Sequence, residues 1–129
     1  MESRKRVLVV TDGAPSVHTL AEQIGAELSS CHVAVLRASE FAGTDILPVD
    51  VFFLGCDAPE PSSFAYLSEL LRHINLAGRS CGVFSAESDR AVEYLAGLVK
   101  DCEVRFAGSY VARGRAAADL KRWIKAVVK

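Results

Sequence analysis

The sequence of 129 residues lacks the groupings that bind metal ions or form redox-active thiol pairs. Its four cysteines stand singly at positions 31, 56, 81 and 102, with no C-x-x-C motif and no paired histidine spacing beside them. These spacings speak against a zinc site and against a dithiol motif. We therefore expect no bound metal, and we expect the cysteines to be buried thiols in a reducing compartment.

A strong net charge and a long apolar run are also missing. The formal net charge is −1, which gives no reason to expect binding to nucleic acid or to a membrane surface. Basic residues at 4–6 precede an apolar run at 7–10 that is too short for a signal peptide or a membrane span. We therefore expect a cytoplasmic protein that binds neither nucleic acid nor membrane.

Two kinds of apolar pattern alternate along the chain. Continuous apolar runs typical of buried strands occur at 7–10, 32–36, 49–54, 81–84 and 104–111. Apolar residues at helical spacing predict helices at 17–28, 62–75, 88–102 and from about 115 onward. This alternation predicts a doubly wound α/β fold, a parallel sheet covered by helices on both faces, in a single domain over residues 1–129.

Several local signals refine this prediction. Ser62, Ser63 and Ser88 are candidate helix caps, and residues 38–44 are expected to form a short connection. Gly108 indicates a bulge or a break in the last strand. Trp123 has the spacing of a core residue.

Four segments carry a family resemblance. They are the first strand and helix, Val7 to Leu28; the third strand, Asp50-Val-Phe-Phe-Leu-Gly55; a helix closed by Leu76-x-Gly78-Arg79 before a strand that ends in Phe84; and the closing Asp119-Leu120-Lys121-x-Trp123. The chain resembles a short-chain flavodoxin over nearly its whole length. The resemblance implies a five-stranded parallel sheet in the order 2-1-3-4-5, a noncovalently bound FMN and a role in electron transfer.

The resemblance also implies where FMN would bind. Its phosphate would lie in the loop after the first strand, and its ring would lie between the loops after the third and fourth strands. The candidate cofactor-binding residues are Thr11, Asp12, Gly13, Ala14, Ser16, Cys56, Asp57, Ala58, Pro59, Ser85, Ala86, Glu87 and Asp89. We expect an electron carrier or a binding module rather than a catalyst, with no catalytic residues.

The residues in these loops also support a second interpretation. Between Asp12 and Val17 only Ser16 carries a hydroxyl, Pro15 has no N–H to donate, and the charge of Asp12 would repel a phosphate. The loops at 56–61 and 85–89 contain no aromatic residue to stack on a flavin. The alternative is a flavin-free module that uses the same loops to bind another small ligand or a protein.

Single residues suggest further, weaker alternatives. Asp12, Asp57 and Ser85 resemble the acidic site of a phosphoacceptor receiver domain, but Gly55 stands at the acceptor position and no lysine follows the fifth strand. Cys56 has no nearby cation that would activate it, which favours an inert thiol. His18 is expected to be a surface residue.

Charge is distributed unevenly along the chain. Residues 40–103 contain eleven acidic and four basic residues, whereas the C-terminal segment is basic. We expect a protein partner, redox or regulatory, that presents a basic face to the acidic strand-end loops. The basic C-terminal helix is expected to be a solvated surface.

Overall fold

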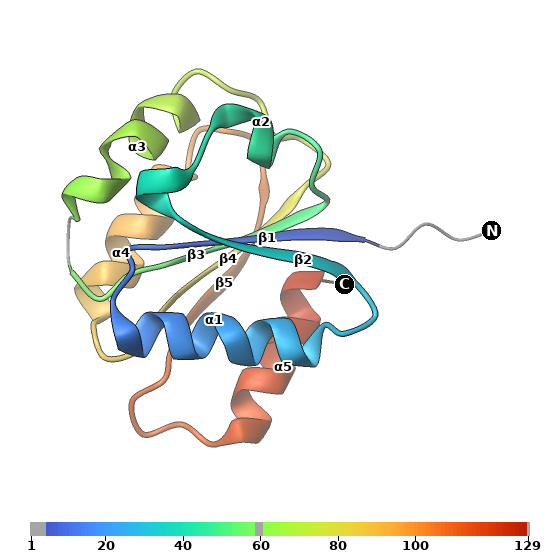
Figure 1. Ribbon diagram of the computed structural model, residues 1–129, viewed down its shortest axis with the longest axis vertical. Helices are drawn as coiled ribbons and strands as arrows, with labels where there is room; N and C mark the ends of the chain where they lie inside the picture. The colour runs from blue at the N-terminus through green and yellow to red at the C-terminus, as the bar shows by residue number, and fades with distance from the viewer. Residues whose placement is uncertain (1–4, 59–60, 129) are drawn as a thin grey trace.

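The computed structural model describes residues 5–58 and 61–128. Its five strands are all parallel and form one sheet in the order β2-β1-β3-β4-β5, which confirms the predicted order (Figure 1). The strands are β1 (Arg6–Thr11), β2 (His32–Arg37), β3 (Val51–Gly55), β4 (Ser80–Ser85) and β5 (Arg105–Val111).

Helices cover both faces of the sheet, as predicted (Figure 1). Helices α1 (Pro15–Glu27) and α5 (Ala117–Val128) pack on one face. Helices α2 (Gly43–Ile46), α3 (Ala65–Leu71) and α4 (Asp89–Leu98) pack on the other. Among the described residues, no helix is both long and apolar enough to cross a bilayer.

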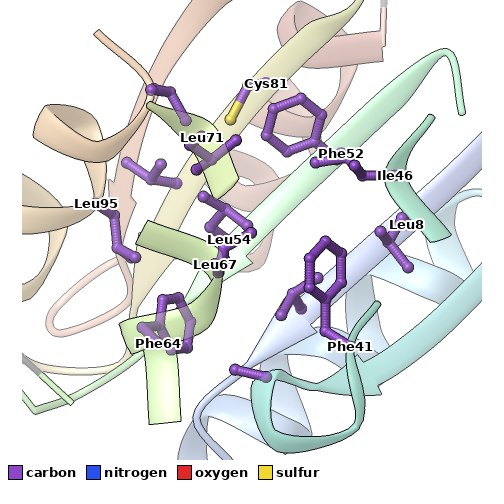
Figure 2. Close-up of a cluster of buried hydrophobic side chains, with 14 of the residues drawn as sticks. Leu8, Phe41, Ile46, Phe52, Leu54, Phe64, Leu67, Leu71, Cys81 and Leu95 are labelled. Atoms are coloured by element: carbon purple, nitrogen blue, oxygen red, sulfur yellow. The ribbon is translucent and has the colours of Figure 1, made fainter. Parts of the chain in front are cut away.

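The two faces of the sheet give two cores because side chains alternate along a strand. Phe52 and Leu54 point into the core under α3 and α4, in the same buried cluster as Phe64, Leu67 and Leu71 (Figure 2). Phe53, next in sequence to both, points to the opposite face, where its ring centroid lies 5.3 Å from that of Trp123. Trp123 is 9% exposed, which confirms the prediction that it belongs to the core.

Some local predictions were wrong in detail. The connection after β2 contains a 3-10 turn at Ala38–Glu40 and the short helix α2. Neither Ser62 nor Ser63 caps α3, because a 3-10 turn that starts after Pro61 precedes this helix. Helix α4 ends at Leu98, so Cys102 lies beyond it, and α5 starts at Ala117 rather than near 115.

Two other local predictions are confirmed. The Ser88 hydroxyl caps α4 by accepting a hydrogen bond from the Ala91 N–H at 3.1 Å. Gly108 has a φ of 111°, and the pairing of β4 with β5 shifts register there. This is the bulge that an isolated glycine in a strand indicates.

Candidate functional site

Three loops meet at the carboxyl edge of the sheet, where parallel α/β folds bind their ligands. They follow β1, β3 and β4, at the end of the sheet where α1 begins (Figure 1). Backbone hydrogen bonds continue the sheet into them: the Asp12 N–H donates to the Gly55 carbonyl and the Cys56 N–H to the Phe84 carbonyl, both at 3.2 Å. The loops are therefore held side by side before any side chain contributes.

The loop after β1 is closed by its own side chains. Asp12 Oδ1 accepts the Ala14 N–H at 3.0 Å, and Thr11 Oγ1 accepts the Gly13 N–H at 3.3 Å. Gly13 has a φ of 85°, a conformation that suits glycine. Pro15 is the first residue of α1, which fits its missing N–H. Two backbone donors of the expected phosphate loop are thus already used within the loop.

The carboxylate of Asp57 lies at the centre of the three loops. Its Oδ2 accepts a hydrogen bond from Ser16 Oγ at 2.6 Å. Its Oδ1 accepts two more, from Ser85 Oγ at 2.6 Å and from the Ala86 N–H at 2.9 Å. The Asp57 N–H in turn donates to Asp12 Oδ2 at 3.1 Å. We call these residues, Asp12, Ser16, Asp57, Ser85 and Ala86, the Asp57 cluster.

Asp57 is held in its charged form. Its partial burial alone would raise the pKa of the carboxyl, but the hydrogen bonds from Ser16, Ser85 and the backbone of Ala86 and Glu87 together lower that pKa below its ordinary value. Ser85, which is fully buried, also accepts the Ser88 N–H at 3.1 Å and so ties the cluster to the start of α4. The cluster contains a fixed internal anion at the site where the resemblance puts FMN.

Cys56 precedes this anion and is buried. Burial, with further contributions from Asp12 and Asp57, raises the pKa of its thiol to about 12. Its Sγ lies 3.3 Å from the Ala58 carbonyl oxygen. A thiol with this pKa is almost entirely protonated at neutral pH, which supports the interpretation of Cys56 as inert.

The rim of the site carries exposed charges of both signs. Glu87 and Asp89 are exposed, and Arg113 joins them: its Nη1 donates to the Glu87 carbonyl at 3.1 Å and its Nη2 lies 3.5 Å from Asp89 Oδ2. Arg37, at the end of β2, runs beside Gly13: a Cβ on Gly13 would lie 3.6 Å from its Cδ. Neither Arg37 nor Arg113 is among the site residues predicted from the sequence, although each ends or follows a strand at this edge.

The structure therefore brings most of the sequence candidates together, through contacts within the chain. Asp12, Ser16, Asp57, Ser85 and Ala86 bond to one another or to the loop backbones. Ala58 is exposed, and Pro59 lies outside the described residues. His18 is exposed beside Glu22, as expected of a surface residue. No group of three or more metal-ligating side chains is found within residues 5–58 and 61–128.

The sheet order, the helices on both faces and the position of this site define a flavodoxin-like fold. The chain is similar to a short-chain flavodoxin associated with a non-canonical PDU bacterial microcompartment, with a TM-score of 0.84, 12% identity, and coverage of 98% of this chain and 97% of that one. It is also similar to Megasphaera elsdenii flavodoxin, with a TM-score of 0.76, 21% identity, and 95% and 98% of the two chains covered.

A third similar structure is flavodoxin 1 from Bacillus cereus, with a TM-score of 0.75, 17% identity, and 94% and 92% of the two chains covered. The sequence matches no family model and no curated protein. At these identities the likeness shows the fold, and the cofactor has to be judged from the residues of the site.

The residues of the site do not fit a tightly held FMN. A phosphate at the loop after β1 would need free donors, but the Ser16 hydroxyl and the Ala14 N–H already donate to carboxylates of this chain. Asp12 and Asp57 would repel a phosphate placed there, by roughly 4 kcal/mol per pair of unit charges at 4 to 5 Å and an effective dielectric of 20. The two loops expected to enclose the ring contribute no aromatic side chain.

Proposed function

We propose that this chain is a flavodoxin-fold module that works without tightly bound FMN and uses its strand-end loops to recognise another protein. The observation that carries the proposal is the hydrogen bond from Ser16 Oγ to Asp57 Oδ2 at 2.6 Å. Because of this bond, the single hydroxyl between Asp12 and Val17 already donates to a carboxylate of the chain itself. A bound phosphate would have to displace that anion or bind beside it.

The surface around the Asp57 cluster supports recognition of a protein. Glu87 and Asp89 are exposed on this rim, and they belong to the acidic stretch of the sequence. Asp89 lies 3.5 Å from Arg113 Nη2, so the side chain of Glu87 is the acidic group on which the proposal depends. Exposed charges of this kind steer a partner of opposite charge and set its association rate. The partner we propose presents a basic face, whether its role is redox or regulatory.

Absorbance and FMN fluorescence test the first half of this proposal. Protein purified from flavin-replete cells is expected to be colourless, and titration into FMN is expected to leave the FMN fluorescence unquenched. The double variant Asp12→Ser/Asp57→Ser removes both carboxylates and is expected to quench more than the parent. Asp101→Asn, an exposed position away from the loops, is the matched control. A yellow protein with acid-releasable flavin would contradict the proposal.

A lysine-rich peptide tests the second half. We expect it to shift the amide resonances of residues 86–89, and we expect its affinity to fall steeply with salt because exposed charges are screened within roughly 8 Å at physiological ionic strength. Glu87→Lys should weaken binding, whereas Lys125→Glu on α5 should not. A peptide affinity that changes neither with salt nor in Glu87→Lys would contradict a docking surface at this edge.

Electron transfer through a noncovalent FMN is the second candidate. The observation in its favour is the fold, which matches flavodoxins over nearly the whole of both chains. If it is correct, the FMN phosphate displaces Asp57 from Ser16, and Asp12→Ser alone should strengthen FMN binding because it removes one repelling charge and adds a donor. Unchanged or weaker FMN binding in that variant would argue against a phosphate at this loop.

A further inference from the structure

A hollow of about 330 Å³ lies between α1 and the start of α5, beside the end of β5. Leu20, Ala112 and Leu120 give it an apolar side. Gln23, Arg115 and Lys121 supply side chains that can donate hydrogen bonds. None of its lining residues belongs to the Asp57 cluster or to the candidates drawn from the sequence.

Tyr110 is the buried polar residue that lines this hollow. Its side chain lies between two neighbours: the Trp123 ring stacks on it with centroids 5.4 Å apart, and the Arg115 guanidinium carbon lies 5.2 Å from its centroid. The residue is 4% exposed, and its hydroxyl is not among the buried side-chain atoms of the described residues that lack a hydrogen-bond partner. No described residue bonds to this hydroxyl, so the small exposed part of the side chain includes it, and it can donate to a group that enters the hollow.

The charged side chains of the hollow are only loosely paired. Arg115 Nε lies 3.6 Å from Asp119 Oδ2, and Lys121 Nζ lies 3.9 Å from Glu27 Oε1. Both distances exceed those of a charge-assisted hydrogen bond, about 2.7 to 2.9 Å, so both cations keep donors free. The hollow is also lined by Ala116 and Ala117, at the N-terminus of α5, where the helix dipole favours an anion. Asp119 Oδ2 already accepts the Ala116 N–H there at 3.2 Å, so the donors left for a ligand are the side chains of Tyr110, Arg115 and Lys121.

We propose that this hollow binds a small organic molecule that carries a single carboxylate on a flat apolar body. The carboxylate would accept hydrogen bonds from the Tyr110 hydroxyl and the Arg115 guanidinium, and the apolar body would lie against Leu20 and Leu120. One negative charge suits the hollow better than two, because the carboxylates of Glu27 and Asp119 already offset part of its positive charge.

The test uses benzoate as the probe. Trp123 is the single tryptophan of the chain and stacks on Tyr110, so its fluorescence reports on the hollow. Benzoate is expected to change that fluorescence with a saturable titration. Two control compounds are each expected to bind at least about tenfold more weakly than benzoate. Benzyl alcohol has the ring without the charge, and inorganic phosphate has charge without the ring.

Variants and chemical shifts assign the binding to these residues. Tyr110→Phe removes only the hydroxyl and is expected to weaken benzoate binding about two- to tenfold, as one hydrogen bond would. Arg115→Gln is expected to weaken it about tenfold or more. Lys125→Gln, exposed on the same helix, is the control and is expected to bind as the parent does. In the unmodified chain, benzoate is expected to shift the amide resonances of Ala112, Ala116 and Ala117.

Three results would overturn the proposal. One is a titration in which benzoate leaves Trp123 fluorescence and these amide resonances unchanged. Another is equal affinity for benzoate and benzyl alcohol, which would make the hollow a nonspecific apolar surface. The third is a folded Tyr110→Phe and a folded Arg115→Gln that both bind benzoate as tightly as the parent. The resonance experiment needs no variant, so a variant that fails to fold leaves the proposal testable.

Discussion

Among single residues, Asp57 belongs to the candidate site and its charge is also expected to stabilise the folded state. Because its folded pKa lies below the ordinary value of 3.8, the carboxylate contributes stability above that pH, and the contribution is lost as the pH falls toward the folded pKa. We expect Asp57→Asn to lower the free energy of unfolding at pH 7 by roughly 1.5 to 3 kcal/mol, the range for hydrogen bonds to a charged group. Urea denaturation at pH 7 measures it.

The pH dependence separates this effect from a general loss of packing. The difference in unfolding free energy between the parent and Asp57→Asn should shrink below about pH 4, where the parent carboxyl also becomes neutral. Asp101→Asn, exposed and distant from the cluster, should show no such trend. A difference that stays constant from pH 7 to pH 3 would mean that the charge of Asp57 is not what its partners stabilise.

The cysteines allow a second prediction at this scale. Cys56 is buried with a pKa raised to about 12, whereas Cys31 is only half-buried, so the expectation of buried thiols was wrong for Cys31. In the folded protein at pH 8, a thiol reagent such as dithionitrobenzoate is expected to react first with Cys31. Cys31→Ser should remove this fast phase and Cys56→Ser should leave it unchanged. A fast phase lost in Cys56→Ser instead would identify Cys56 as a reactive thiol.

The sequence could identify most members of the Asp57 cluster but not their contacts. Asp12, Ser16, Asp57 and Ser85 follow strands whose carboxyl ends must meet at one edge, so their proximity follows from the sheet order. The conformation of the loop after β3 decides that Asp57 turns toward Ser16, and no periodic pattern encodes it. Arg37 was not predicted because it ends an edge strand, and only its long side chain brings it beside Gly13.

Among the elements, β4 and α5 pack closely because β4 contains a glycine. A Cβ on Gly82 would lie 2.6 Å from a side-chain carbon of Val127 and 2.8 Å from one of Trp123, too close unless these side chains or their helix shift. We expect Gly82→Ala to destabilise the fold by roughly 1 to 3 kcal/mol, the cost of overpacking a core. Thermal or urea unfolding measures it, and weakened near-UV dichroism of Trp123 should accompany it.

A glycine in α4 gives the opposite prediction and serves as the control. Gly97 is helical, and a Cβ there would meet nothing within 4 Å. Gly97→Ala is therefore expected to stabilise the protein by about 0.5 to 1 kcal/mol, because alanine loses less backbone freedom on folding. Equal effects of the two substitutions would mean that backbone freedom, and not contact with α5, determines the cost at Gly82.

The strands could be predicted from the sequence and the short helices could not, for a physical reason. Buried parallel strands such as Val51–Gly55 are continuous apolar runs, which stand out between polar turns. Helix α2 has only four residues, too few for a period of 3.6 to show. The same holds for the 3-10 turn after Pro61, where a backbone turn takes the place of the predicted serine cap.

For the whole molecule, thermal unfolding in the presence of FMN separates the two proposed functions. A ligand that binds only the folded state stabilises it by about 2.7 kcal/mol at a hundred times its Kd, which for a domain of this size raises the Tm by roughly 10 °C. We expect excess FMN to leave the Tm of the parent unchanged, because Asp57 already provides the anion that the loops need. The Asp12→Ser/Asp57→Ser variant should start with a lower Tm and regain part of the loss when FMN is added.

Riboflavin, which lacks the phosphate, is the control and should not raise the Tm of that variant. A clear rise in the Tm of the parent with FMN but not with riboflavin would instead show that the phosphate competes successfully with Asp57, and it would make electron transfer the better proposal.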